Sequence, residues 1–143
     1  MTTQAIETSP PGRSPAPALW AGRALSGLAA LFLLMDAGGK LIAPEAMIAN
    51  SPPIGLPADV GFYRTLGAIL LACTALYAWP RTAMLGAVLL TGYLGGAVAS
   101  HLRVGSPLFS HVLFGVYLGL FVWGGLWLRC PALRALMPLG SRE

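Results

Sequence analysis

Four long apolar stretches, separated by proline-containing breaks, constrain this chain more than any other feature of its sequence. A helix needs about 20 mostly apolar residues to cross the hydrocarbon core of a bilayer, and each stretch is close to that length. Only 10% of the 143 residues are charged, whereas soluble domains carry roughly 25%. We therefore predict an all-α, polytopic membrane protein built as a four-helix transmembrane bundle.

Capping residues and prolines set the predicted helix boundaries. We expect helices over about residues 20–42, 59–79, 82–102 and 107–129, with N-caps at Asp59, Thr82 and Ser106. Prolines stop the first, second and fourth helices at Pro44, Pro80 and Pro131. Residues 1–18, rich in proline and serine, are predicted to be a disordered tail. Residues 131–143 are predicted to be a short basic interfacial tail, with Leu133, Leu136 and Met137 facing lipid.

Basic residues are unevenly distributed between the two ends of the predicted bundle. The end that holds both termini and the 79–82 link carries Arg13, Arg23, Arg81, Arg129, Arg134 and Arg142. The opposite end carries Lys40, Arg64 and Arg103. Cytoplasmic loops are enriched in Lys and Arg, so we predict that both termini are cytoplasmic. The bias toward Ala, Gly, Leu and Arg, with a single Lys, suggests a GC-rich bacterial genome and hence the bacterial inner (plasma) membrane.

The net charge of +4 does not indicate nucleic-acid binding, because the basic residues are scattered singly along the chain. The sequence has no Walker loop, GxSxG elbow, HExxH pair or CxxCH haem attachment. A nucleotide-driven enzyme is therefore not expected, and no catalytic residue is assigned. Whether the chain is an enzyme at all, and whether it forms oligomers, the sequence leaves open.

Polar side chains gather at the predicted non-cytoplasmic end of the bundle. The candidates for ligand binding or for an ion network are Asp36, Lys40, Arg64, Tyr93, His101, Arg103 and His111. Asp36 and Lys40 are four residues apart and share one helical face, so they are placed to form an ion pair. A lone charge at the centre of a membrane costs about 2.5–3.5 kcal/mol on insertion scales, which is why such residues pair or face a wet cavity.

Two interpretations of this cluster are open. In the first, Asp36, Lys40 and Arg64 form an ion network that only fixes the first helix against the second. In the second, the cluster lines a pocket, because ionisable residues within membrane spans mark ligand or ion pathways. Tyr93, Ala97 and His101 recur every four residues and form a stripe that suits such a pocket.

Metal and anion sites are weaker hypotheses for the same end. A spacing of ten residues between His101 and His111 fits no standard metal motif, so no metal site is predicted. Arg64, Arg103 and the start of the fourth helix would attract an anion. Asp36, Glu45 and Asp59 lie on the same side, however, and favour mutual neutralisation.

Glycine pairs four residues apart occur in the third and fourth predicted helices. They are Gly92 with Gly96 and Gly115 with Gly119. Small residues at this spacing let helices approach closely in membranes. We expect them to be packing contacts, with a hinge or a ligand approach as the alternative.

Several stretches resemble the DoxX-like family of small four-helix integral membrane proteins. They are DAGGKL at 36–41, TGYLGGAVASHLRVG at 91–105, LFSH at 108–111 and RCPALR at 129–134, and they anchor an alignment over about 20–139. The resemblance implies the four-helix fold and places Asp36, Lys40, His101, Arg103 and His111 at the family's polar positions. Cys130 stands where relatives commonly carry an acidic residue, which puts a salt bridge there in doubt.

The family's name comes from a membrane subunit of a thiosulfate:quinone oxidoreductase, and related proteins include redox-linked subunits and membrane assembly factors. The resemblance thus favours a binding or accessory component for a quinone-like or lipid-like molecule, linked to a redox partner. Side chains here carry no electrons themselves, so redox chemistry would need a cofactor such as a quinone, or a partner protein. One alternative is a structural or assembly protein that contacts membrane lipids and a partner protein. The other is a small-solute or proton-coupled carrier.

Overall fold

The computed structural model describes residues 16–50 and 55–137. Every regular element in these ranges is helical: α1 (Ala16–Ile42), α2 (Pro44–Asn50), α3 (Val60–Ala78), α4 (Ala83–Arg103), the π-helical turn η1 (Leu108–Val112), α5 (Phe114–Arg129) and α6 (Pro131–Leu136). Four segments of this part of the chain are long and apolar enough to cross a membrane, namely α1, α3, α4 and η1 with α5. The predicted all-α, four-span fold is confirmed, while the cytoplasmic placement of the termini remains a prediction.

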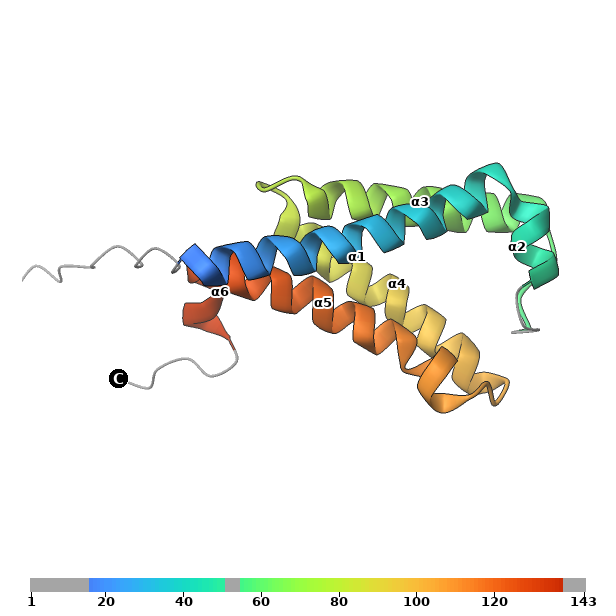
Figure 1. Ribbon diagram of the computed structural model, residues 1–143. Coiled ribbons are helices and arrows are strands. Elements are labelled where there is room, and N and C mark those ends of the chain that lie inside the picture. The colour runs from blue at the N-terminus through green and yellow to red at the C-terminus, as the bar shows by residue number, and fades with distance from the viewer. Residues whose placement is uncertain (1–15, 51–54, 138–143) are drawn as a thin grey trace, which may run out of the picture.

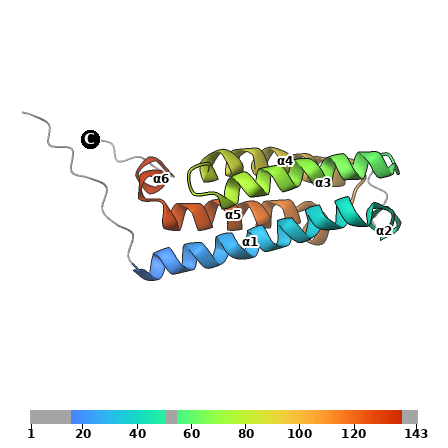
Figure 2. The ribbon, with the colours of Figure 1, turned by 90° about the horizontal axis from the view of Figure 1, so that it is seen from above.

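The spanning helices form a bundle that is tight at one end and splayed at the other (Figure 1). The start of α1, the α3–α4 link and α6 lie at the tight end, and α2 lies at the splayed end (Figures 1 and 2). We call these the narrow end and the wide end. α1 packs on α3 and α5, and α4 packs on the same two helices.

A buried tyrosine ties three helices together toward the narrow end. The ring of Tyr77 on α3 is almost fully buried, and its hydroxyl lies 2.9 Å from the carbonyl oxygen of Val122 on α5 and 2.8 Å from Oγ of Ser26 on α1. A phenol has one proton, so Tyr77 donates to the carbonyl and accepts from the serine. The Arg129 guanidinium lies 5.4 Å from the centre of the same ring, a cation–π contact.

Three prolines begin helices where the sequence suggested tails or breaks. α1 begins at Ala16, four residues before its predicted start, because Pro17 falls in the first turn, where its missing N–H has no helical partner to lose. Pro44 and Pro131 end the preceding helices as expected, but each also begins a short helix, α2 and α6. In α6, Leu133 packs into the core and does not face lipid. Residues 1–15 of the predicted tail lie outside the described residues.

Of the three predicted N-cap residues, one forms a side-chain capping bond and two do not. Asp59 caps α3 as expected, since its carboxylate accepts from the Phe62 N–H at 2.7 Å. The Thr82 hydroxyl instead donates to the carbonyl of Leu76 at 2.7 Å. Ser106 does not cap the fourth span, because its hydroxyl lies 3.1 Å from Nδ1 of His101 and the span opens with the π turn η1.

Candidate functional site

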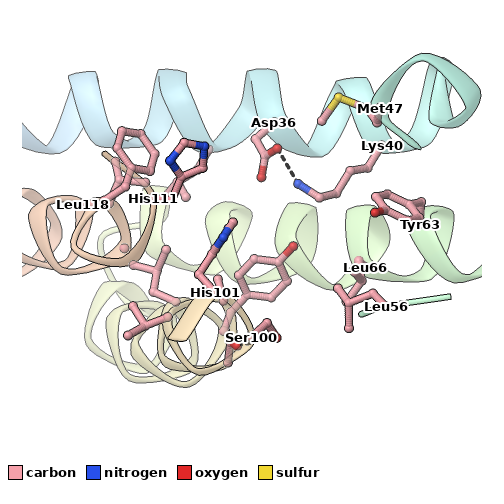
Figure 3. A pocket seen from close by; sticks show the side chains of 18 of the residues that line it. Asp36, Lys40, Met47, Leu56, Tyr63, Leu66, Ser100, His101, His111 and Leu118 are labelled. Carbon is pink, nitrogen blue, oxygen red and sulfur yellow. Dashed lines mark hydrogen bonds and ion pairs between the residues drawn. The ribbon is translucent and has the colours of Figure 1, made fainter. Parts of the chain in front are cut away.

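A cavity of about 490 Å³ lies between the splayed helices. Every described helix except α6 contributes to its wall, and so does the segment between α2 and α3. Small-molecule sites in proteins occupy about 300–1,000 Å³, so the cavity has the size of a ligand site. Figure 3 shows its polar residues on opposite walls, with Asp36 and Lys40 on α1 and with His101 on α4.

The α1 wall carries an ion pair. The Lys40 ammonium donates to the Asp36 carboxylate one helical turn away, as the spacing predicts. The two side chains keep 13% and 27% of their surface exposed, respectively. Because each charge faces its opposite, this wall presents a polar surface with no net charge.

Two histidines face each other on the other side of the cavity. His101 ends α4, His111 lies in η1, and their ring centres are 5.6 Å apart. Each Nδ1 is engaged by a serine hydroxyl, Ser106 for His101 at 3.1 Å and Ser110 for His111 at 2.7 Å. These bonds orient the two rings, and the hydrogen bonds of the rings among the described residues use Nδ1 and not Nε2.

The π turn sets the position of His111. The N–H groups of His111 and Val112 both approach the carbonyl of Pro107, at 3.1 and 3.3 Å, and Leu113 bonds to Leu108 at 2.8 Å. A π turn holds one more residue than an α turn, and such turns occur frequently at functional sites. The extra residue changes the direction in which His111 leaves the helix relative to α5, and the observed direction is toward His101.

Five of the seven candidate site residues line this one cavity: Asp36, Lys40, Tyr93, His101 and His111. Ala97, the middle residue of the predicted stripe, lines it too. Tyr63 on α3 is a further polar residue that lines the cavity, and it is buried. These five candidate residues thus lie around one space, and their role there remains a prediction.

The remaining two candidates, Arg64 and Arg103, lie outside the cavity. Tyr63 points inward, and successive helical residues are about 100° apart, so Arg64 is exposed on the outer side of α3. The expected network of Asp36, Lys40 and Arg64 is thus reduced to the Asp36–Lys40 pair. Nη2 of Arg103 donates to the carbonyl of Gly55 at 3.0 Å, across from α4 to the segment before α3.

The geometry also bears on metal and anion binding. Within residues 16–50 and 55–137, no group of three or more His, Cys, Asp or Glu side chains is arranged to hold a metal ion. An anion in the cavity would meet neither Arg64 nor Arg103 there, and the Lys40 ammonium already faces a carboxylate. Among the described residues, the charged side chains that line the cavity are therefore Asp36 and Lys40, which pair with each other.

Sequence reasoning missed much of the apolar wall and misassigned one glycine pair. Met47 on α2 and Leu56 line the cavity, although no periodicity in their segments marks them.

A Cβ added at Gly92 or Gly96 would meet no atom within 4 Å, and both residues line the cavity. The expected packing role is wrong for these two. Gly115 does pack, since its Cβ would lie 2.9 Å from Cγ2 of Val98, whereas Gly119 meets nothing.

Comparison with known proteins gives one family. The model of the DoxX-like family matches residues 24–125 of the 143, a range that includes all seven candidate residues. No curated protein and no solved structure gives a significant match.

Proposed function

This chain belongs to the DoxX-like family, and from that premise we propose that it is a multi-pass membrane component that binds a lipophilic molecule with an uncharged, oxygen-containing head group. The single observation that carries the proposal is the cavity between the splayed helices, whose polar groups converge on one space. A quinone-like or lipid-like molecule fits this description. A redox protein in the membrane would be its partner if the bound molecule is a quinone.

The charges of the cavity favour a neutral head group. Asp36 and Lys40 are the charged side chains among the described residues that line it, and they neutralise each other. A phosphate would have to compete with Asp36 for the Lys40 ammonium. The histidine Nε2 atoms and the hydroxyl of Tyr93 suit carbonyl and hydroxyl oxygens, because these groups donate or accept single hydrogen bonds.

The narrow end favours binding over transport. A carrier must open its site alternately to both sides of the membrane. At the narrow end, a Cβ on Gly86 would lie within 2.5 Å of the Cα of Tyr77, and one on Gly22 would lie 2.9 Å from the carbonyl oxygen of Gly125. These contacts close the α3–α4 and α1–α5 sides at the narrow end, which supports a site that opens at the wide end or sideways.

Binding of a short-tailed isoprenoid quinone to the purified protein in detergent tests the proposal. We expect saturable binding by isothermal titration calorimetry, and a loss of about two- to tenfold in affinity for His101→Ala and His111→Ala, since one hydrogen bond contributes about 0.5–1.5 kcal/mol. Arg64→Ala is the matched control, because this residue lies at the same end but outside the cavity. Absence of binding, or equal binding by all variants, contradicts the proposal.

Native mass spectrometry of gently extracted protein separates this function from the assembly alternative. A stoichiometric small-molecule adduct that is lost in His101→Ala supports the binding proposal. A chain that carries another protein and no small molecule supports an assembly role, in which the Asp36–Lys40 pair only stabilises the bundle.

A further inference from the structure

α3 and α4 touch at the narrow end and separate toward the wide end. At Gly86 the backbones are so close that a Cβ would lie 2.7 Å from the carbonyl carbon of Leu76. Six and ten residues further along α4, Gly92 and Gly96 have no neighbour within 4 Å of an added Cβ. Successive helical residues are about 100° apart, so Gly92 and Gly96 point about 80–120° away from the direction of Gly86 and lie beside the face of α4 that touches α3. Figure 1 shows α4 diverging from α3 toward the wide end.

The other helix pairs stay in contact at the wide end. A Cβ on Gly67 of α3 would lie 2.9 Å from Cβ of Lys40 on α1, and one on Gly115 of α5 would lie 2.9 Å from Val98 on α4. Between α1 and α5, the rings of Phe32 and Phe114 meet edge to face at 5.1 Å between centres. On the α3–α4 side, the described residues show the Gly86 contact at the narrow end and the Arg103–Gly55 hydrogen bond at the wide end, and the stretch of α4 between them carries Gly92 and Gly96.

The cavity reaches the protein surface on this side. Gly92 and Gly96 line it from α4 and are also exposed, and Phe62 and Leu66 line it from α3. Gly92 lies near the middle of the 21-residue α4, which places it near mid-depth in a hydrocarbon core of about 30 Å. The opening is thus apolar and faces lipid tails. The polar residues lie deeper in the cavity and nearer the wide end.

We propose that the gap bounded by Phe62, Leu66, Gly92 and Gly96, here the α3–α4 portal, admits the single apolar tail of an amphiphile whose neutral head group reaches His101 and His111. This inference rests on the proposed function and deepens it, because it identifies the bilayer as the source of the ligand. A cavity of about 490 Å³ has the size of a site for one small molecule, which suits a ligand with one tail. Among the described residues that line it, the cation is Lys40, which is paired with Asp36. The occupant is therefore a single-tailed neutral amphiphile rather than a phospholipid.

The glycines give a direct test, because the helix offers a matched control. Leucine at Gly92 or Gly96 would place a side chain in the portal. Leucine at Gly95 would not, since Gly95 also has no neighbour within 4 Å but does not line the cavity. Leu66→Trp narrows the portal from the α3 side and serves as a second variant should the Gly96 variant fold poorly.

Two quinones with the same head group, one with a long isoprenoid tail and one without a tail, are titrated into each purified variant. We expect Gly96→Leu and Leu66→Trp to bind the long-tailed quinone about tenfold or more weakly than wild type, a difference of about 1.4 kcal/mol. Gly95→Leu should bind it as wild type does. The tail-less quinone should bind equally to all four proteins.

The results of these titrations distinguish failure of the portal from failure of the proposed function. If wild type binds neither quinone, the proposed function and the portal both fail. If wild type binds, and the portal variants bind the long-tailed quinone as tightly as Gly95→Leu does, the portal is wrong while the site stands. Equal loss of both quinones in the portal variants, or displacement of the long-tailed quinone by a phospholipid, also overturns the portal.

Discussion

A Cβ atom at Gly86 should damage this fold more than one at any glycine of the portal. The added atom at Gly86 would lie 2.5 Å from Cα of Tyr77 and 2.7 Å from the carbonyl carbon of Leu76, both of which are backbone atoms. Ordinary Cβ contacts are 3.4 Å or longer, so α3 and α4 would have to separate by about 1 Å. Overpacking of a close-packed core costs about 1–3 kcal/mol, and occasionally more.

Helix propensity opposes this cost but is smaller. Gly to Ala in a helix interior gains about 0.8–1.0 kcal/mol, and this gain applies equally to Gly92, where the added atom meets nothing. We therefore expect Gly86→Ala to lower the free energy of unfolding by up to about 2 kcal/mol and Gly92→Ala to raise it by up to about 1 kcal/mol. The opposite signs of the two changes follow from the splay of the bundle.

Thermal unfolding of wild type, Gly86→Ala and Gly92→Ala in one detergent, followed by far-UV circular dichroism, measures the difference in stability between them. Gly95→Ala adds a control on the same helix, because its added atom also meets nothing, and it should behave as Gly92→Ala does. If Gly86→Ala unfolds at the same temperature as Gly92→Ala or above it, α3 and α4 do not touch at Gly86. The narrow end would then not be the closed end of the bundle.

Three further predictions concern stability and orientation. Tyr77→Phe should lower the free energy of unfolding by about 1–3 kcal/mol, because it leaves the buried Ser26 hydroxyl without its acceptor and the Val122 carbonyl without its side-chain donor. Denaturant titration measures this change, and an unchanged midpoint contradicts the three-helix contact. Asp36→Asn should lower the stability of the protein by about 1–3 kcal/mol, because it leaves the Lys40 ammonium unpaired. Adding Lys40→Met to this variant should restore much of the loss. Equal stability of the single and double variants in thermal melts refutes the pairing. A reporter fused at the C-terminus should behave as cytoplasmic, and activity on the opposite side would reverse the predicted topology.

The fold follows from the sequence because length and apolarity alone restrict a chain in a membrane to helices. Helix boundaries were less predictable where prolines were involved. Pro44 and Pro131 were expected to end helices, and they do, but each also begins a short helix in the position where proline is best tolerated. A proline indicates that a helix ends there, but it does not indicate whether another helix begins.

The polar half of the site was predictable because membrane energetics makes charges conspicuous. Asp36, Lys40, His101 and His111 stand out in apolar helices, and they line one cavity. Arg64 was misplaced because sequence order gives its depth in the membrane and not its direction. Its direction depends on Tyr63, the adjacent residue, which occupies the inward position instead.

The apolar half of the site depends on the angle between helices, which no single helix encodes. Gly86 and Gly92 are the same residue in the same helix, yet one meets backbone and the other meets open space. The difference arises because Gly86 points at the backbone of α3 at the narrow end, whereas Gly92, six residues on and about 120° around the helix, lines the cavity and points away from that contact. Glycine spacing is therefore compatible both with tight packing and with a gap, and the contacts of neighbouring helices decide which of the two forms.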